Sequence, residues 1–175
     1  MKTTIRSRSG FTLIELLMVI VIIALLTSVI LSSLANSKGK ARDGKRISDI
    51  SQIQLSLEQY FDRCNVYPPT IDPSNSLYTD PNQCSANPGI LMSSFISTMP
   101  TPPSGSSLAQ SQYDYAYNST RTDYALHAVL ENTNDAVKDG LPSNTYPLSG
   151  WTSALGNTFT CNNAAGSTDY CVGPK

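Results

Sequence analysis

A long apolar run near the N-terminus is the strongest constraint on how this chain folds. Residues 11–35 read FTLIELLMVIVIIALLTSVILSSLA, with no proline or glycine and with Glu15 as the one charged residue. At about 1.5 Å per residue, these 25 residues would form a helix of roughly 37 Å, longer than the roughly 30 Å hydrocarbon core of a membrane. Backbone polar groups in lipid must bond within the segment, which favours a helix. We therefore expect a transmembrane helix over 11–35, which excludes an ordinary cytosolic globule.

Glu15 interrupts this run at its fifth position. A carboxylate inside a bilayer costs at least about 2–3 kcal/mol, so it needs a partner or a function. Alternatively, the membrane segment begins at Leu16 and the carboxylate of Glu15 reaches water at the membrane edge.

Two other interpretations of the run are open. In the first, Ser33-Leu34-Ala35 is the cleavage site of a signal peptide and the mature chain begins at Asn36. The apolar core of a signal peptide is usually about 7–15 residues, however, and this run is longer and contains Glu15. In the second, the run is a plain membrane anchor.

Charge alone does not orient the run, because both flanks are basic. The positions of the cysteines do indicate which side of the membrane the rest of the chain occupies. All of them follow the run, in an even number, and this pattern predicts disulfides in an oxidising space outside the cytoplasm. Four cysteines allow three pairings, and the nearest-neighbour pairing joins Cys64 to Cys84 and Cys161 to Cys171.

The residues around the start of the run resemble a known signal. A basic leader ends in Gly10 and is followed by Phe11-Thr12-Leu13-Ile14-Glu15 and about twenty apolar residues. This arrangement resembles the prepilin signal of type IV pilins and of the pseudopilins of type II secretion and DNA-uptake systems. The resemblance continues through residues 40–61 and Tyr67-Pro68, and it covers about the first 70 residues.

The resemblance implies a maturation and assembly route. A prepilin peptidase would cut between Gly10 and Phe11 and methylate the new amine of Phe11. Glu15 would then pair with the Phe11 amine of a neighbouring subunit in a helical homo-oligomer. Opposite charges attract strongly at low dielectric, whereas either charge alone is penalised. The implied partners are membrane lipid before assembly, other pilins or pseudopilins, and an inner-membrane assembly platform with its ATPase.

Beyond the apolar run, the chain stays periodic but becomes amphipathic. Apolar residues recur at steps of three and four from Ile47 to Phe61, and this predicts a helix that continues to about residue 62. Gly39 and Gly44 should loosen or bend it near 36–45. The charged positions of this helix are expected to be solvated; they are Asp43, Arg46, Asp49 and Glu58. A basic cluster is interpreted as a solvated collar, and the alternative is that it binds acidic lipid head groups or DNA; its members are Lys38, Lys40, Arg42, Lys45 and Arg46.

Residues 63–175 predict an extracytoplasmic globular head. Tyrosines alternate with other residues over 113–117, and a second strand pattern covers 124–130, which together indicate a β-hairpin. A short helix is expected over 90–99. One face of the strands should cover the C-terminal half of the long helix. The predicted fold class is therefore α+β, with a leader at 1–10, a helix at 11–62 (transmembrane over 11–35, amphipathic over 36–62) and a small antiparallel sheet in the head.

Nothing in the head predicts catalysis or a cofactor. His127 is interpreted as a packing or surface residue, because no nucleophile and base are paired in the sequence. A group of polar residues could crowd a Ca²⁺ ion, but a polar loop without metal is expected there; the group is Glu131, Asn134, Asp135 and Asp139.

The leading hypothesis is a structural subunit of a type IV pilus or a similar filament, held in the inner membrane before assembly and later extracellular or in the envelope. The two candidate disulfides and the absence of a calcium-loop signature favour this hypothesis over a pseudopilin of a secretion or DNA-uptake system. A third possibility is a membrane-anchored binding module.

Overall fold

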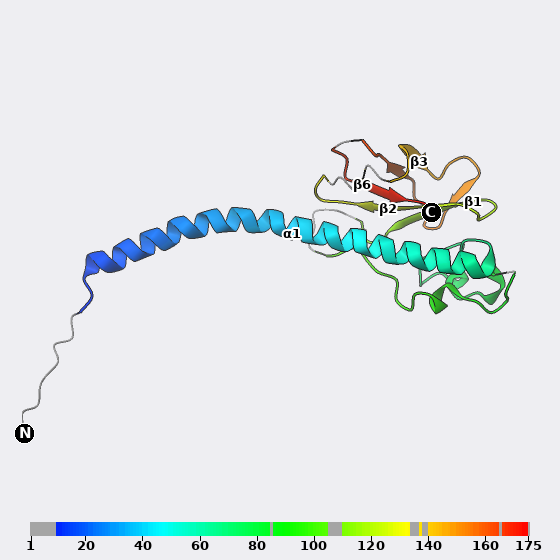
Figure 1. The fold of residues 1–175 in the computed structure, drawn as a ribbon, viewed down its shortest axis with the longest axis horizontal. Coiled ribbons are helices and arrows are strands. Elements are labelled where there is room, and N and C mark those ends of the chain that lie inside the picture. The colour runs from blue at the N-terminus through cyan, green and yellow to red at the C-terminus, as the bar shows by residue number, and fades with distance from the viewer. Residues whose placement is uncertain are drawn as a thin grey trace, which may run out of the picture. The chain divides into compact units, whose positions relative to one another are not determined.

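In the computed structural model, the described residues form one long helix and two small antiparallel sheets (Figure 1). The structure describes residues 10–84, 86–104, 110–133, 137, 140–164 and 166–174, with the side chains of the long helix described at 13–28, 30, 34 and 37–64. The chain divides into two units, Met1–Lys38 and Gly39–Lys175.

The helix α1 runs without interruption from Leu13 to Cys64, over 52 residues. The sequence pattern predicts 11–62, so the helix is confirmed with both ends within two residues. The helical backbone continues through 36–45, where Gly39 and Gly44 were expected to loosen it. The expected loosening is therefore not found, whereas the expected bend stays a prediction. Gly39 provides room for a loop that packs on α1, as described below.

The predicted hairpin forms the centre of the larger sheet. Strands β1 and β2 pair antiparallel, with Tyr115 opposite Leu126. The sheet has the order β4-β1-β2-β6, and a second sheet pairs β3 with β5. The strand bounds are β1 Asp114–Asn118, β2 Tyr124–Val129, β3 Asn144–Tyr146, β4 Trp151–Ser153, β5 Phe159–Cys161 and β6 Asp169–Val172.

The larger sheet packs one face on the C-terminal half of α1 (Figure 1). Because side chains alternate along a strand, Tyr115 and Leu126 face α1, whereas Ala116 and Ala125 face the other way. The inner face and α1 bury one apolar cluster, which includes Ile50, Ile53, Leu57, Tyr60, Tyr115, Tyr124 and Leu126. The outer face packs against the small sheet in a second cluster, which includes Ala116, Ala125, Tyr146, Phe159 and Cys161. The α+β prediction is confirmed.

The proline-rich segment between α1 and β1 is a long loop with three turns of 3-10 helix. These are Ser76–Tyr78, Pro81–Gln83 and Met92–Ser94. The helix expected over 90–99 is therefore reduced to a single turn. The loop is held to the core by a disulfide between Cys64 and Cys84 and by the Tyr115 hydroxyl, which donates to the Pro68 carbonyl at 2.8 Å.

Candidate assembly site

The start of α1 is a capping box built from Thr12 and Glu15. The backbone N–H and the hydroxyl of Thr12 donate to Oε2 of Glu15 at 2.8 and 2.7 Å. In return, the Glu15 N–H donates to Oγ1 of Thr12 at 3.4 Å. This reciprocal arrangement satisfies donors that the first turn of a helix leaves unpaired. Glu15 therefore already has a partner within one chain, and both of these bonds to its side chain use Oε2.

The role of Thr12 was missed by the sequence analysis, although the signal was present. Threonine followed three residues later by glutamate, just before an apolar run, is the pattern of a capping box. Glu15 was interpreted as a charge that either needs a partner or a function or reaches water at the membrane edge, and not as part of a helix cap. The structure gives the same carboxylate a second role, which is to begin the helix.

Gly10 and Phe11 precede α1 and are both exposed. Apart from its two chain neighbours, no described residue has an atom within 4 Å of the position that a Cβ on Gly10 would occupy. The Gly10–Phe11 peptide bond thus lies outside regular secondary structure and is not covered by other parts of the described chain. A peptidase could reach this bond without unfolding the helix. The rest of the predicted leader, residues 1–9, lies outside the described residues.

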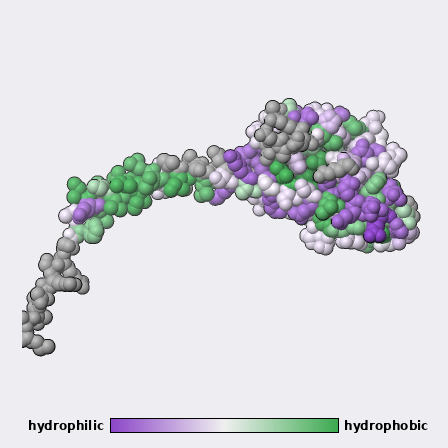
Figure 2. Space-filling view, viewed as in Figure 1, coloured by the Kyte–Doolittle hydropathy of each residue, from purple (hydrophilic) through white to green (hydrophobic). Residues whose placement is uncertain are grey.

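The described apolar side chains in the first turns of α1 are uncovered. Figure 2 shows them as a hydrophobic surface along the helix. Leu13 is 83% exposed, and Val19, among the least exposed of them, is still 47% exposed. Continuous apolar surface of this kind has a large free-energy cost in water, so it requires lipid or other protein. No helical segment among the described residues combines the length and the hydropathy of a membrane-crossing helix.

The charged residues at the start of the amphipathic half of α1 are buried, contrary to the expectation of a solvated surface. Asp43, Arg46 and Asp49 are each at most 3% exposed. Nη1 of Arg46 lies 2.8 Å from Oδ1 of Asp43 and 3.0 Å from Oε1 of Glu131. Arg42 joins the same carboxylate of Glu131 with two bonds of 2.6 and 2.5 Å. Glu58 is half-buried and accepts bonds from two tyrosine hydroxyls.

These contacts form an ionic cluster that holds the segment after β2 on α1; we define it as Arg42, Asp43, Arg46, Glu131 and Asn132. Asp43 also accepts bonds from the backbone N–H groups of Glu131 and Asn132 at 2.7 and 2.9 Å. A Cβ on Gly39 would meet Nδ2 of Asn132 at 2.9 Å, so the glycine allows the close approach.

The electrostatics of the cluster favour its charged form. The hydrogen bonds from Arg42, supported by those from Arg46, lower the pKa of Glu131 to about 2. The bond to Glu131 raises the pKa of Arg42 in turn. Glu131 and Arg42 are therefore both charged at neutral pH. Arg42 and Arg46 belong to the ionic cluster and not to a solvated collar, and Lys45 pairs with the buried Asp49 at 2.9 Å.

His127 lies on the outer face of the larger sheet and is buried. Its ring stacks on Phe159, with centroids 5.1 Å apart and planes 2° from parallel. Nδ1 lies 3.0 Å from Oδ2 of Asp114, and Nε2 lies 3.4 Å from Oδ1 of Asp169. The ring thus bridges β1, β2 and β6, as a packing residue would.

Of the polar group considered for Ca²⁺, the structure describes Glu131 alone. Glu131 is occupied by Arg42 and Arg46. Asn134, Asp135 and Asp139 lie outside the described residues. No group of three or more histidine, cysteine, aspartate or glutamate residues among those described could hold a metal ion.

Both disulfides of the nearest-neighbour pairing are formed. Cys64–Cys84 joins the end of α1 to the proline-rich loop. Cys161–Cys171 joins β5 to β6 and therefore ties the small sheet to the larger one. One disulfide thus lies near the start of the head and the other lies near its C-terminus.

Comparisons with known proteins agree with this arrangement. A prokaryotic N-terminal methylation motif matches residues 5–31. The type II secretion system core protein G of Aeromonas hydrophila is 33% identical over 100 residues, which cover 57% of this chain and 70% of that protein. The Vibrio cholerae protein of the same name is 36% identical over 76 residues, or 43% of this chain and 52% of that protein. The Escherichia coli protein of this name is 38% identical over 81 residues, which cover 46% of this chain and 55% of that protein.

No solved structure matches the chain. The chain spans only about half the length of the Vibrio and Escherichia relatives, but it covers more than two thirds of the Aeromonas protein at 33% identity. The fold agrees with this relationship, because it combines a long N-terminal helix with a small antiparallel sheet. The chain therefore belongs to the family of type IV pilins and pseudopilins that includes the type II secretion system core protein G.

Proposed function

We propose that this protein is a pseudopilin-like structural subunit that is cut between Gly10 and Phe11, methylated on Phe11 and assembled into a helical filament. The single observation that carries the proposal is an uncovered apolar helix with one carboxylate, Glu15, at its start. Before assembly, the apolar run 11–35 lies in the inner membrane and the disulfide-bonded head lies outside the cytoplasm. In the filament, the same surface packs against other copies.

The capping box supports a specific role for Glu15 in assembly. Oε2 accepts both bonds from Thr12, and no bond to Oε1 is found among the described residues. One carboxylate can therefore begin its own helix and also receive the Phe11 amine of a neighbouring subunit. Cleavage creates that amine, so an uncut chain lacks the charge that Glu15 would pair with. Two opposite charges in a dry helix bundle attract strongly, and this sets the axial register of each subunit.

The partners of the proposed process are a prepilin peptidase, an inner-membrane assembly platform with its ATPase, and other pseudopilins. Relatives named as type II secretion core proteins favour a secretion-type pseudopilus in the envelope. A type IV pilus subunit is the second candidate. It is favoured by the two disulfides, which suit a head exposed outside the cell.

The test is the mass of the N-terminal peptide, measured on cell envelopes and on a sheared surface fraction that is also viewed by electron microscopy. We expect a chain that begins at N-methylated Phe11. Its presence only in the envelope favours the pseudopilus, and its presence in thin surface filaments favours the pilus. A chain that begins at Met1 or at Asn36 contradicts the proposal.

A matched pair of variants tests the assembly step separately from cleavage. Glu15→Ala should be cut normally but should not assemble. Thr12→Ser keeps the hydroxyl of the capping box and should assemble. Normal filaments from Glu15→Ala would show that the carboxylate does not direct assembly.

A further inference from the structure

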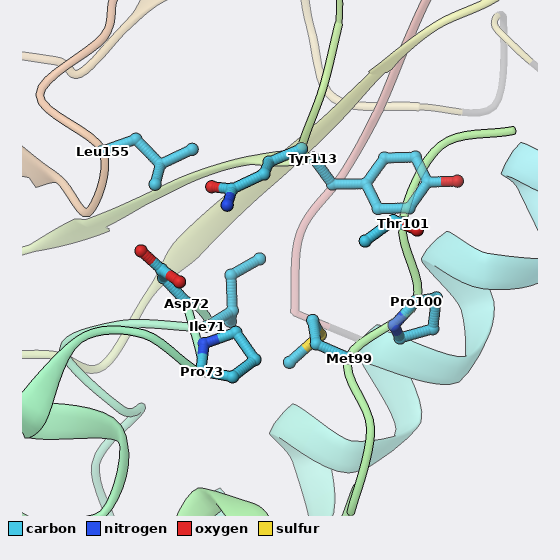
Figure 3. Close-up of a pocket in the computed structure, with 9 residues that line it drawn as sticks. Ile71, Asp72, Pro73, Met99, Pro100, Thr101, Tyr113 and Leu155 are labelled. Atoms are coloured by element: carbon cyan, nitrogen blue, oxygen red, sulfur yellow. The ribbon is translucent and has the colours of Figure 1, made fainter. Parts of the chain in front are cut away.

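A small cavity opens in the head where the proline-rich loop meets the larger sheet (Figure 3). Its volume is about 70 Å³. Residues of the loop form one side, and the chain next to β1 and β4 forms the other. The walls are largely apolar and include Ile71, Pro73, Met99, Pro100 and Leu155, and the polar residues on them are Asp72, Thr101, Gln112 and Tyr113. Such a cavity suits a slender apolar group and not a large flat ligand.

Asp72 places a carboxylate on this apolar cavity. Its Oδ1 accepts bonds from the backbone N–H and the hydroxyl of Ser74, at 2.9 and 2.7 Å. The ion pairs found among the described residues use other acids, so Asp72 has no cation beside it there. An apolar slot with an unpaired carboxylate fits a lysine, whose methylene stem packs on apolar walls while its ammonium stays at a polar rim.

The basic residues of α1 divide into those with acidic partners and those without. Arg42, Lys45 and Arg46 are paired with acids of their own chain. Lys40 is exposed and has no ion pair within the described part of the chain. It also belongs to the same compact unit as the cavity, Gly39–Lys175.

We propose that this cavity receives the side chain of Lys40 from a second copy of the chain, with its ammonium against Asp72. The inference rests on the proposed function, since it assumes that copies assemble. The two groups lie at different places on one unit. Each copy therefore carries both halves of the contact, which can repeat head to tail, and such a heterologous contact that does not close on itself generates an open helical filament. The contact between heads would help to set the axial position of each subunit, in addition to the contact that Glu15 makes between helices.

The experiment uses assembled wild-type filaments treated with a carbodiimide, which joins an amine to a carboxylate only where the two touch. Filaments grown from a mixture of ¹⁴N- and ¹⁵N-labelled chains distinguish links between copies from links within one copy. We expect a mixed-isotope peptide that joins Lys40 to Asp72. A link from Asp72 to Lys38, to a different protein or to a lysine of its own copy overturns the inference, as does no link at all.

Charge reversal provides the second measurement. Lys40→Asp and Asp72→Lys should each lower filament yield by roughly tenfold, the equivalent of a coupling of about 1.4 kcal/mol. The double variant should recover most of the yield. Asp62→Lys, at an exposed acid away from the cavity, is the matched control and should have no effect. Normal yield from both single variants overturns the docking inference, whereas the absence of filaments from the wild-type chain contradicts the proposed function itself.

Discussion

Arg46 and Glu131 are 85 residues apart in sequence, and Nη1 of the arginine lies 3.0 Å from Oε1 of the glutamate. Arg46 is 1% exposed, so this pair fixes the segment after β2 on α1 from within the core. Removing one partner of a buried pair leaves the other charge uncompensated, which costs more than the pair itself contributes.

Glu131→Ala should therefore destabilise the head strongly. We expect the free energy of unfolding to fall by about 2–3 kcal/mol, because Asp43 remains to neutralise part of the Arg46 charge. The measurement is urea denaturation of the full chain in detergent, with unfolding monitored by tyrosine fluorescence. Lys38→Ala is the control, since Lys38 is exposed and unpaired within the described residues. Equal midpoints for the two variants would show that the ionic cluster does not stabilise the fold.

The same glutamate predicts an acid dependence of stability. Its pKa falls from the ordinary 4.5 to about 2 in the folded chain because Arg42 and Arg46 donate to it. A lowered folded pKa gives stability that is complete above about pH 4.5 and is lost as the pH falls toward 2. Glu131→Gln has no carboxylate to protonate at this position. Its free energy of unfolding should therefore change less between pH 5 and pH 2 than that of the wild-type chain. If the free energy of unfolding had the same pH dependence in the wild-type chain and in the variant, the prediction would be contradicted.

The long helix and the hairpin could be predicted because their signals are local. Apolar steps of three and four over 47–61 indicate the buried side of α1, and alternation over 113–117 indicates a strand. The burial of Asp43 and Arg46 could not be predicted in this way. Their partner, Glu131, is 85 or more residues away, and no local period marks such a pair. Charged residues within an amphipathic helix are usually solvated, so the general rule favoured the wrong answer.

The candidate assembly site was predictable in part. Gly10, Phe11 and Glu15 stand out because a glycine, an aromatic residue and an acid interrupt or border a uniform apolar run. The cavity beside Asp72 has no such signal. Its walls come from four separate stretches of the chain that only the folded head brings together.

The disulfide between β5 and β6 should contribute substantially to the stability of the head. Cys161 and Cys171 are 10 residues apart, and the chain-entropy treatment gives about 3 kcal/mol for closing a loop of this size. We expect the double variant Cys161→Ala, Cys171→Ala to lose about this amount in urea denaturation, with the rest of the fold intact by circular dichroism. Reduction of the wild-type chain should have at least as large an effect, because it also opens Cys64–Cys84. An unchanged midpoint in the double variant would contradict the prediction.

Gly39 and Gly44 lie five positions apart on α1. Replacing each of them by alanine should change the free energy of unfolding in opposite directions. At Gly44, nothing lies within 4 Å of an added Cβ, so Gly44→Ala gains only helix propensity and should stabilise the chain by up to about 1 kcal/mol.

At Gly39, the added Cβ would meet Nδ2 of Asn132 at 2.9 Å and displace the amide from Asp43, to which it donates at 2.8 Å. A hydrogen bond to a charged group contributes about 1.5–3 kcal/mol, which exceeds the gain in propensity. Gly39→Ala should therefore lower the free energy of unfolding by about 1 kcal/mol. Adding Asn132→Ala removes the clash, so the second substitution should cost less in the Gly39→Ala background than in the wild-type chain. If both glycine variants are stabilised equally, the segment after β2 does not pack on α1 as the structure shows.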